Sequence, residues 1–439
     1  MTASQITHRR LLRVAGPIIL SNATVPLLGA VDTAVIGQLG QAAPLGAVGL
    51  GAVILGTLYW AFGFLRMSTS GLAAQAKGAG DGVEVSATLL RALIIGLVAG
   101  LALVALQWPL IWAAVRIAPA TAEVEGFTRT YLAIRIWGAP ATIALYALTG
   151  WLIALERTRA VLVLQVWQNG LNIGLDLWFV LGLGWGIGGV ASATLIAEWT
   201  GLALGLYLAR ATFGATFRAA WARVPDRLAL AHTFRASRDI MGRSVILQLS
   251  FTTFVFIGAR FGTVTLAANH VLLQFLEITA FALDGIAFAA ETLVGQAIGA
   301  RAVADVRRAC LLSFQWGFAG AGLMALVFVV GSRPIIDLLT TSTEVRAEAR
   351  LYVPWLIAAP LIGVASWIYD GIFIGALLTG QMLRAMVWSV AIYLVALLTL
   401  IPALGNHGLW GALMVLLVAR AATLWRASPA IAARAGAGR

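Results

Sequence analysis

The sequence predicts an all-α polytopic membrane protein with twelve transmembrane helices, arranged as two pseudo-symmetric six-helix bundles related by an axis along the membrane normal. Its composition, its regularly spaced apolar stretches and an internal repeat each support this fold class. Of the 439 residues, 61% are hydrophobic and 11% are charged, whereas an ordinary soluble domain has roughly 25% charged residues. At roughly 20 apolar residues per crossing, a chain of this length accommodates about twelve spans.

Six apolar stretches lie in the first half of the chain and six in the second. In order, they cover 14–39, 48–74, 88–115, 130–155, 160–183, 187–209, 241–262, 269–298, 309–331, 351–378, 385–402 and 408–425. Each must be helical at this depth, because hydrocarbon offers no hydrogen-bond partner to the backbone of an open strand. The first stretch continues past Pro17, Pro26 and Asp32 without a small-residue cleavage site, so we expect an uncleaved span there and not a signal peptide.

The basic residues indicate how the chain is oriented in the membrane. The longest connection, 210–243, contains seven arginines, whereas the connections 40–46, 182–188 and 402–407 contain no lysine or arginine. Because cytoplasmic loops retain lysine and arginine, the arginine-rich side is predicted to be cytoplasmic. Both termini then lie in the cytoplasm, at a bacterial-type plasma (inner) membrane. The net charge of +12 therefore reports topology and does not predict a nucleic-acid partner.

The two halves of the chain match each other at a constant offset of 221 residues. The matching pairs are Gly37 with Gly258, Gln75 with Gln296, Gly78-Ala79 with Gly299-Ala300, Tyr131 with Tyr352, and Gly150 with Gly371. This repeat predicts an N-lobe at 1–209, a cytoplasmic connection at 210–240 and a C-lobe at 241–439. Because each half has an even number of spans, both enter the membrane from the same side, and we expect parallel repeats with a substrate cleft between them.

Ionisable side chains inside the apolar stretches are candidate functional residues, because a carboxylate near the bilayer centre costs about 2.5 to 3.5 kcal/mol. The seven such residues are Asp32, Asp176 and Glu198 in the first half and Glu277, Asp284, Glu291 and Asp370 in the second. Asn172 and Asp176 are four residues apart and share one face of the fifth helix, where their oxygen atoms can hold a proton or a small cation. We interpret Asp32 and Asp176 as coupling residues in preference to purely structural hydrogen-bonding groups.

The acids of the second half are candidates for substrate binding. Glu277, Asp284 and Glu291 are spaced by seven residues, so they form one stripe along the eighth helix. Glu291 is interpreted equally well as an ion-pair partner of a nearby arginine at the cytoplasmic end. Asp370, near the middle of the tenth span, is the better candidate for facing the cleft.

Two aromatic residues are further candidates for the substrate cleft. Tyr59 lies in the second span and Trp367 in the tenth, and an aromatic face attracts an organic cation. For any single one of them, packing or interfacial anchoring is the simpler interpretation.

The sequence predicts no cofactor and no certain metal centre. The single cysteine, Cys310, and four scattered histidines form no metal-binding pattern. The glycine-rich segment 78–82 lacks the Lys-Ser/Thr ending of a phosphate-binding loop. Without a nucleotide-binding domain, transport must be driven by a gradient of H⁺ or Na⁺. The expected partners are membrane lipid and small organic substrates, with no nucleic acid, and we expect a monomer.

Three segments carry a resemblance to a known family: Val31 to Gly37, Gly71 to Gln75 with its partner Thr292 to Gln296, and Asn172 to Asp176. With them the chain resembles the multidrug and toxic compound extrusion (MATE) family, and within it the DinF-like branch. The resemblance implies an antiporter that exchanges protons or sodium for organic cations and other toxic compounds. It also implies a cation site, for H⁺ or possible Na⁺ binding, made of Asp32, Asn172, Asp176 and Thr194. The seventh span, 242–262, has no carboxylate, unlike the NorM-like branch, and this difference favours protons.

Two other functions are less consistent with the sequence than export. A flippase for lipid-linked precursors, from the wider superfamily of MATE proteins, should have an arginine-lined cleft to hold a pyrophosphate, whereas the predicted cleft is acidic. A membrane-embedded enzyme is disfavoured because the spans contain no Ser/His/Asp arrangement, histidine cluster or paired nucleophile. The sequence therefore predicts a secondary active transporter.

Overall fold

A computed structural model of the chain describes residues 6–24, 31–32, 34–38, 42–117, 120–213 and 216–436. Every regular element within these ranges is helical, and they contain no strand. Ten helical segments of the described part are long and apolar enough to cross a membrane. The all-α membrane fold is thus confirmed. The count of twelve spans stays a prediction, because the first and fifth predicted spans are not among the ten, and residues 25–30 and 33 of the first lie outside the described residues.

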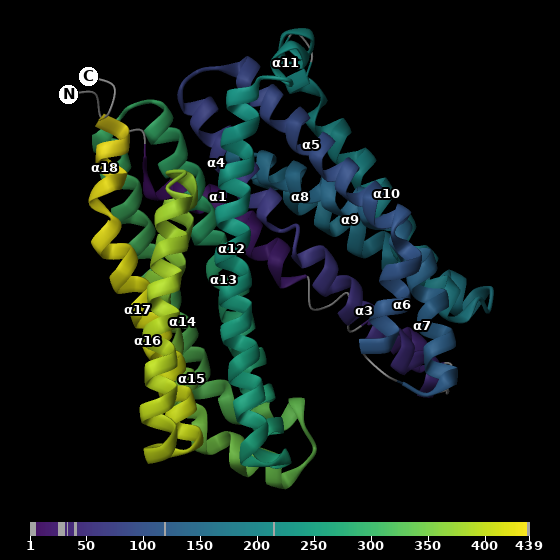
Figure 1. Ribbon diagram of the computed structural model, residues 1–439. Helices are drawn as coiled ribbons and strands as arrows, with labels where there is room; N and C mark the ends of the chain where they lie inside the picture. The colour runs from purple at the N-terminus through teal and green to yellow at the C-terminus, as the bar shows by residue number, and fades with distance from the viewer. Residues whose placement is uncertain are drawn as a thin grey trace. The chain divides into compact units, whose positions relative to one another are not determined.

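The helices follow the order of the predicted spans (Figure 1). Before the long connection they are α1 (His8–Ala23), α3 (Ala42–Trp60), α4 (Phe64–Gly78), α5 (Gly82–Ala105), α6 (Gln107–Ile117), α7 (Ala122–Arg135), α8 (Ala139–Ala154), α9 (Thr158–Asp176) and α10 (Gly186–Phe213). After it they are α11 (Phe217–Arg223), α12 (Arg227–Gly258), α13 (Thr263–Gly299), α14 (Val303–Leu339), α15 (Thr343–Gly375), α16 (Thr379–Leu404), α17 (Asn406–Ala427) and α18 (Pro429–Gly436). The second, third and fourth predicted spans therefore each contain two helices.

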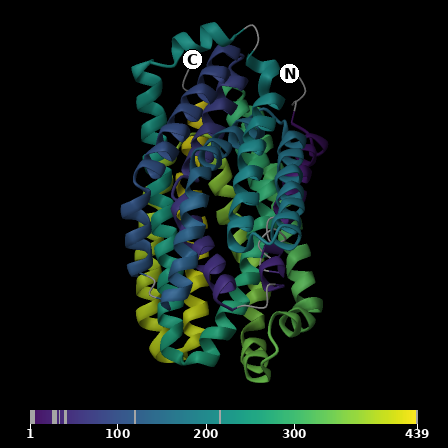
Figure 2. The ribbon, with the colours of Figure 1, turned by 90° about the vertical axis from the view of Figure 1, so that its right-hand side faces the viewer.

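The chain divides into two compact units. The C-terminal unit contains Met1–Ile19, Ala74–Gly80 and Phe234–Arg439, and the N-terminal unit contains Leu20–Ala73 and Asp81–Thr233. In the C-terminal unit, α16 and α17 lie side by side (Figure 2). Each unit has its own apolar core. Fully buried members are Phe254, Phe275, Leu356 and Trp410 in the C-terminal unit and Ile36, Leu65, Ile143 and Val190 in the N-terminal unit.

The internal repeat is visible in the backbone conformation as well as in the sequence. Left-handed φ angles occur in pairs separated by 221 residues, at Gly80 (74°) and Arg301 (54°), Glu156 (59°) and Leu377 (52°), and Gly184 (68°) and Gly405 (57°). After α8 and α15 the chain also forms the same closing hydrogen bond, from Arg157 N to Leu152 O at 2.8 Å and from Leu378 N to Phe373 O at 3.0 Å. These are the bonds of a helix end with a left-handed residue after its last turn. The two halves therefore end their equivalent helices in the same way.

At two equivalent glycines, neighbouring helices cross with their backbones in direct contact. A Cβ atom at Gly150 would overlap the carbonyl oxygen of Arg66, and a Cβ atom at Gly371 would overlap that of Ala287. These partners are also 221 residues apart. The match of glycines found in the sequence therefore has a packing reason in both units.

Gly371→Ala should lower the thermal unfolding temperature of the purified protein. The added methyl group has no space against the Ala287 carbonyl, and overpacking of this kind costs about 1 to 3 kcal/mol. Gly322→Ala in α14 is the matched control, because no heavy atom lies within 4 Å of the added Cβ. The control should be neutral or stabilising by up to about 1 kcal/mol, since alanine is the better helix former. Equal unfolding temperatures for the two variants would contradict the contact.

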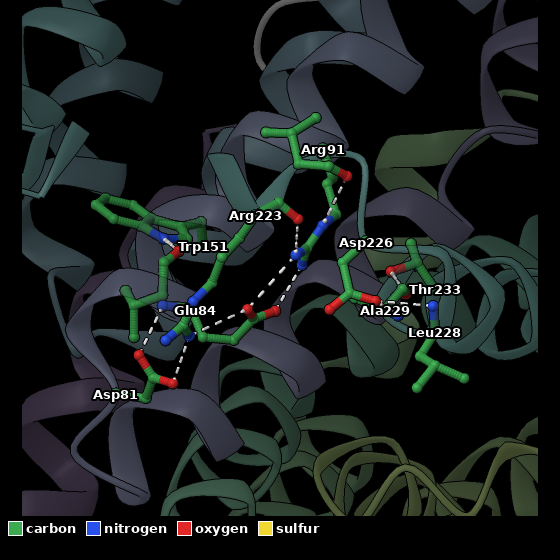
Figure 3. Close-up of polar contacts among 11 residues, drawn as sticks. Asp81, Glu84, Arg91, Trp151, Arg223, Asp226, Leu228, Ala229 and Thr233 are labelled. Atoms are coloured by element: carbon green, nitrogen blue, oxygen red, sulfur yellow. Dashed lines mark hydrogen bonds and ion pairs between the residues drawn. The ribbon is translucent and has the colours of Figure 1, made fainter. Parts of the chain in front are cut away.

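The long connection is anchored to the start of α5 by ion pairs (Figure 3). Arg223 at the end of α11 contacts Asp81 at 2.6 Å, and Arg91 contacts Glu84 at 2.5 Å. Arg91, whose side chain is 2% exposed, also donates to the carbonyl oxygens of Arg223 and Val224 at 2.6 and 3.3 Å. The Arg223 guanidinium holds the pKa of Asp81 below its ordinary value. Part of the predicted connection 210–240 is thus an ordered helix packed within the N-terminal unit.

Candidate functional site

The structure brings together Asp32, Asn172, Asp176 and Thr194 in the N-terminal unit. Asp32 follows α1, Asn172 and Asp176 lie on one face of α9, and Thr194 lies on α10. Asn172 and Asp176 are 1% and 0% exposed, Thr194 is buried, and Asp32 is half-buried. Asp176 is the last residue of α9 before a π-helical turn, Leu177–Gly182. Such turns inside α-helices are frequent at functional sites.

The Asn172 amide bridges the two carboxyl groups. In the orientation that satisfies both ends of the amide, its nitrogen donates to Asp32 Oδ1 at 3.1 Å and to Asp176 Oδ2 at 3.2 Å. Its oxygen faces the Thr194 hydroxyl, 3.0 Å away. The carboxyl groups of Asp32 and Asp176 also lie within hydrogen-bonding reach of each other. One amide therefore fixes the positions of both acids.

One oxygen of this cluster is left without a partner. Asp176 Oδ1 is buried and accepts no hydrogen bond from any residue that the structure describes. A buried acceptor without a donor is unfavourable unless a proton or a bound group satisfies it. The cluster therefore has a place for one additional proton or for a small ligand.

An arginine–glutamate pair lies next to the carboxyl cluster. Arg135 at the end of α7 donates from Nη1 to Glu198 Oε2 at 2.7 Å and from Nη2 to Oε1 at 2.9 Å. Both side chains are largely buried, and the Arg135 charge acts on Asp32 and Asp176. Glu198, one of the buried carboxylates predicted from the sequence, is thus bound by Arg135 in a bidentate ion pair.

Tyr59 lies beside Arg135. Its ring is 5% exposed and belongs to the core of the N-terminal unit. Its hydroxyl donates to the backbone oxygen of Arg135 at 3.2 Å. This placement matches the packing interpretation of the residue.

The predicted acids of the second half are placed differently from one another. Asp370 on α15 accepts, through its Oδ2 atom, hydrogen bonds from Arg243 on α12 and from Arg420 on α17, the latter at 2.5 Å. Asp284 on α13 is half-buried and attracts the Arg243 charge. Glu277 is exposed on α13. The structure therefore groups Asp284 and Asp370 around Arg243 and leaves Glu277 on the surface of the unit.

Two other residues of that half are buried in different ways. Trp367 on α15 is half-buried and packs against the core of the C-terminal unit. Glu291 on α13 is 1% exposed.

Arg243 and Arg420 are absent from the predicted site residues. The sequence contains a signal for Arg420, because an arginine inside the apolar stretch 408–425 requires a buried partner. Arg243 carries a weaker signal, because it lies at the end of an arginine-rich connection, where arginines indicate topology. Both guanidinium groups are more than nine-tenths buried.

A family model described as MatE matches residues 17–178 and, a second time, residues 240–400. The chain belongs to the MatE family. The double match coincides with the two halves of the internal repeat. DNA damage-inducible protein F of Escherichia coli (strain K12) is 41% identical over 432 residues, covering 96% of this chain and 92% of that protein. A probable multidrug resistance protein NorM of Deinococcus radiodurans is 31% identical and covers 92% of this chain and 90% of that protein.

Solved structures have the same fold. An outward-facing multidrug resistance MATE family transporter of the MOP superfamily superposes with a TM-score of 0.86 at 19% identity, over 97% of this chain and 96% of that one. A MATE structure in the straight conformation gives a TM-score of 0.87 at 18% identity. The predicted resemblance to the MATE family and its DinF-like branch is confirmed, and so is the predicted class, a membrane transporter.

Proposed function

We propose that this MatE chain exports small organic, often cationic, toxic compounds in exchange for protons by alternating access. The observation that supports the proposal is the buried pair Asp32 and Asp176, bridged by the Asn172 amide and left with one unpartnered oxygen. The NorM relative, named as a probable multidrug resistance protein, supports the substrate class. We further propose that both termini are cytoplasmic, that the membrane is a bacterial inner membrane, and that the chain acts as a monomer.

The carboxyl pair gives a physical reason for coupling. Two carboxylates in a buried site repel each other, and one proton bound between them removes that repulsion. Loss of the proton leaves an additional negative charge in a region of low dielectric. There, the charge attracts a cationic substrate more strongly than the same charge would in water. Proton and substrate then compete for the same charge, and this competition is the requirement for exchange.

The orientation of Asn172 favours a proton over sodium. A sodium ion needs several oxygen ligands, and a carboxylate pair could supply some of them. In the orientation that satisfies both ends of the amide, however, its nitrogen faces both carboxyl groups and its oxygen faces Thr194. An N–H donor aimed at the place of the ion is compatible with a shared proton and unfavourable for a cation.

Dye efflux from inverted membrane vesicles separates the two coupling ions. We expect a pH gradient alone, in sodium-free buffer, to drive dye movement, and a protonophore to abolish it. A sodium gradient at equal pH on both sides should give the same trace as vesicles without the protein. The opposite pattern would assign sodium as the coupling ion, and no response to either gradient would reject ion-coupled exchange.

The alternative function, flipping of a lipid-linked precursor, gains one supporting observation. Arg243 and Arg420 supply two buried guanidinium groups of the kind that hold a pyrophosphate. Both are, however, committed to Asp370. Translocation of a fluorescent lipid-linked pyrophosphate by the protein in liposomes, without an imposed gradient, would favour this alternative over export.

A further inference from the structure

A groove of about 730 Å³ opens in the C-terminal unit between α16, α17 and α18. Its lining residues are Gln381, Arg384, Ala385, Trp388, Ile392, Thr423, Arg426, Ala427, Pro429 and Ala430. The wall formed by α18 is held in place by Ile431 and Ala435, which are buried against the rest of the unit. None of these residues belongs to the carboxyl cluster or to the group around Asp370, so the groove is a separate feature.

Two arginines line one end of the groove. Arg384 lies near the start of α16 and Arg426 near the end of α17. The two helices are joined at Gly405 and run antiparallel, so both arginines lie at the same end of the pair. Both are exposed, and neither has a carboxylate within ion-pair distance among the residues that the structure describes. Among the described residues, the Arg384 side chain is bonded only through Nε, to the Gly380 carbonyl at 3.3 Å.

An apolar stripe leads from this basic end along α16. Trp388 and Ile392 follow Arg384 at intervals of four residues, so all three lie on one helical face. Trp388 is 67% exposed and Ile392 is 44% exposed, and the exposed Val395 continues the stripe beyond the groove. Basic groups at the membrane boundary, then tryptophan, then aliphatic side chains follow the polarity profile of one bilayer leaflet.

The Thr423 hydroxyl, which lines the groove, already has partners within the protein. It donates to the Ala419 carbonyl at 2.8 Å, and the Ser389 hydroxyl donates to that of Ala385 at 2.7 Å. The two hydroxyl oxygens lie 3.1 Å apart between α16 and α17.

We propose that the groove binds one anionic phospholipid of the phosphatidylglycerol type. The phosphate pairs with Arg384 and Arg426, and one acyl chain lies along Trp388 and Ile392. Guanidinium groups bind phosphate through paired, charge-assisted hydrogen bonds. A phosphatidylcholine headgroup brings a cation toward the same arginines and is disfavoured. Basic residues near a membrane surface contribute about 1 kcal/mol each toward anionic lipid, so each arginine should improve affinity about fivefold.

Lipid titration of the delipidated full-length chain in detergent tests the proposal. We expect dioleoylphosphatidylglycerol to raise the unfolding temperature at lower concentration than dioleoylphosphatidylcholine, and inorganic phosphate to have no effect. Native mass spectrometry should detect one retained phosphatidylglycerol. In Arg384→Gln/Arg426→Gln, the midpoint concentration of phosphatidylglycerol should rise roughly 25-fold, by the same estimate per arginine. The control Arg307→Gln/Arg333→Gln removes two other exposed arginines and should titrate like the unchanged protein.

A second variant keeps both charges and narrows the groove. Ala430→Phe should also lose the retained lipid, because its ring occupies the space beside Pro429 and α17. If the double arginine variant fails to fold, this variant and the comparison of lipids on the unchanged protein still decide the question. Equal stabilisation by both lipids, stabilisation by phosphate alone, or retention of phosphatidylglycerol in Ala430→Phe would overturn the proposal.

Discussion

Asp32→Asn and Asp176→Asn should each abolish gradient-driven efflux while leaving the amount of folded protein unchanged. Each replacement keeps the size of the side chain and removes the charge that exchanges a proton for a cationic substrate. For one proton exchanged, an imposed difference of one pH unit supplies about 1.4 kcal/mol, enough to sustain a concentration ratio of roughly tenfold. Without coupling, this ratio should fall to one. Dye accumulation in inverted vesicles under an imposed pH gradient measures the difference.

A surface aspartate provides the matched control for this loss. Asp337 lies near the end of α14 with its side chain 40% exposed, and it pairs with Arg350 at 2.7 Å. Asp337→Asn makes the same chemical change outside the carboxyl cluster and should leave accumulation at the level of the unchanged protein. Accumulation that persists in Asp32→Asn would remove Asp32 from the coupling mechanism. A loss in Asp337→Asn as well would point to a general effect of lowering the negative charge.

The carboxyl cluster was predictable because its members carry local signals. The four-residue spacing of Asn172 and Asp176 fixes a shared helical face from the sequence alone. The insertion cost of Asp32 marked it as a residue with a function, and the family resemblance paired it with the fifth helix and with Thr194. What spacing could not supply is the bridging role of the Asn172 nitrogen. That role depends on the direction from which Asp32 approaches, which is a tertiary fact.

For a similar reason, the sequence could not predict which residues surround Asp370. Arg243 and Arg420 are far from Asp370 in the chain, and nothing in their spacing indicates that three different helices meet at one carboxylate. From Asp370, an acidic residue inside a span, the sequence therefore predicted an acidic site. In the structure, two guanidinium groups contact this one carboxylate. The repeat, by contrast, was fully visible, because equivalent turns and crossings require the same small residues in both halves. Gly150 and Gly371 show this directly.

Arg135→Leu should destabilise the protein by about 3 to 5 kcal/mol, because it leaves Glu198 buried without its partner. The lost contact is a double hydrogen bond between two largely buried side chains. Replacing both residues, as Arg135→Leu/Glu198→Leu, should recover most of the stability, since an apolar pair of similar volume avoids the desolvation of two charges. Thermal unfolding of the purified variants in one detergent measures both effects. The double variant should still transport poorly, because Asp32 and Asp176 lose the neighbouring positive charge.

The same helix carries an exposed pair that serves as the control. Arg129 contacts Glu125 at 2.6 Å, one turn away on α7, with side chains 46% and 34% exposed. Exposed pairs of this kind contribute below about 1 kcal/mol, so Arg129→Leu should shift the unfolding temperature far less than Arg135→Leu. If the two single variants unfold together, Glu198 has another partner or access to water. If the double variant is as unstable as Arg135→Leu, the loss comes from packing of the arginine stem and not from an uncompensated charge.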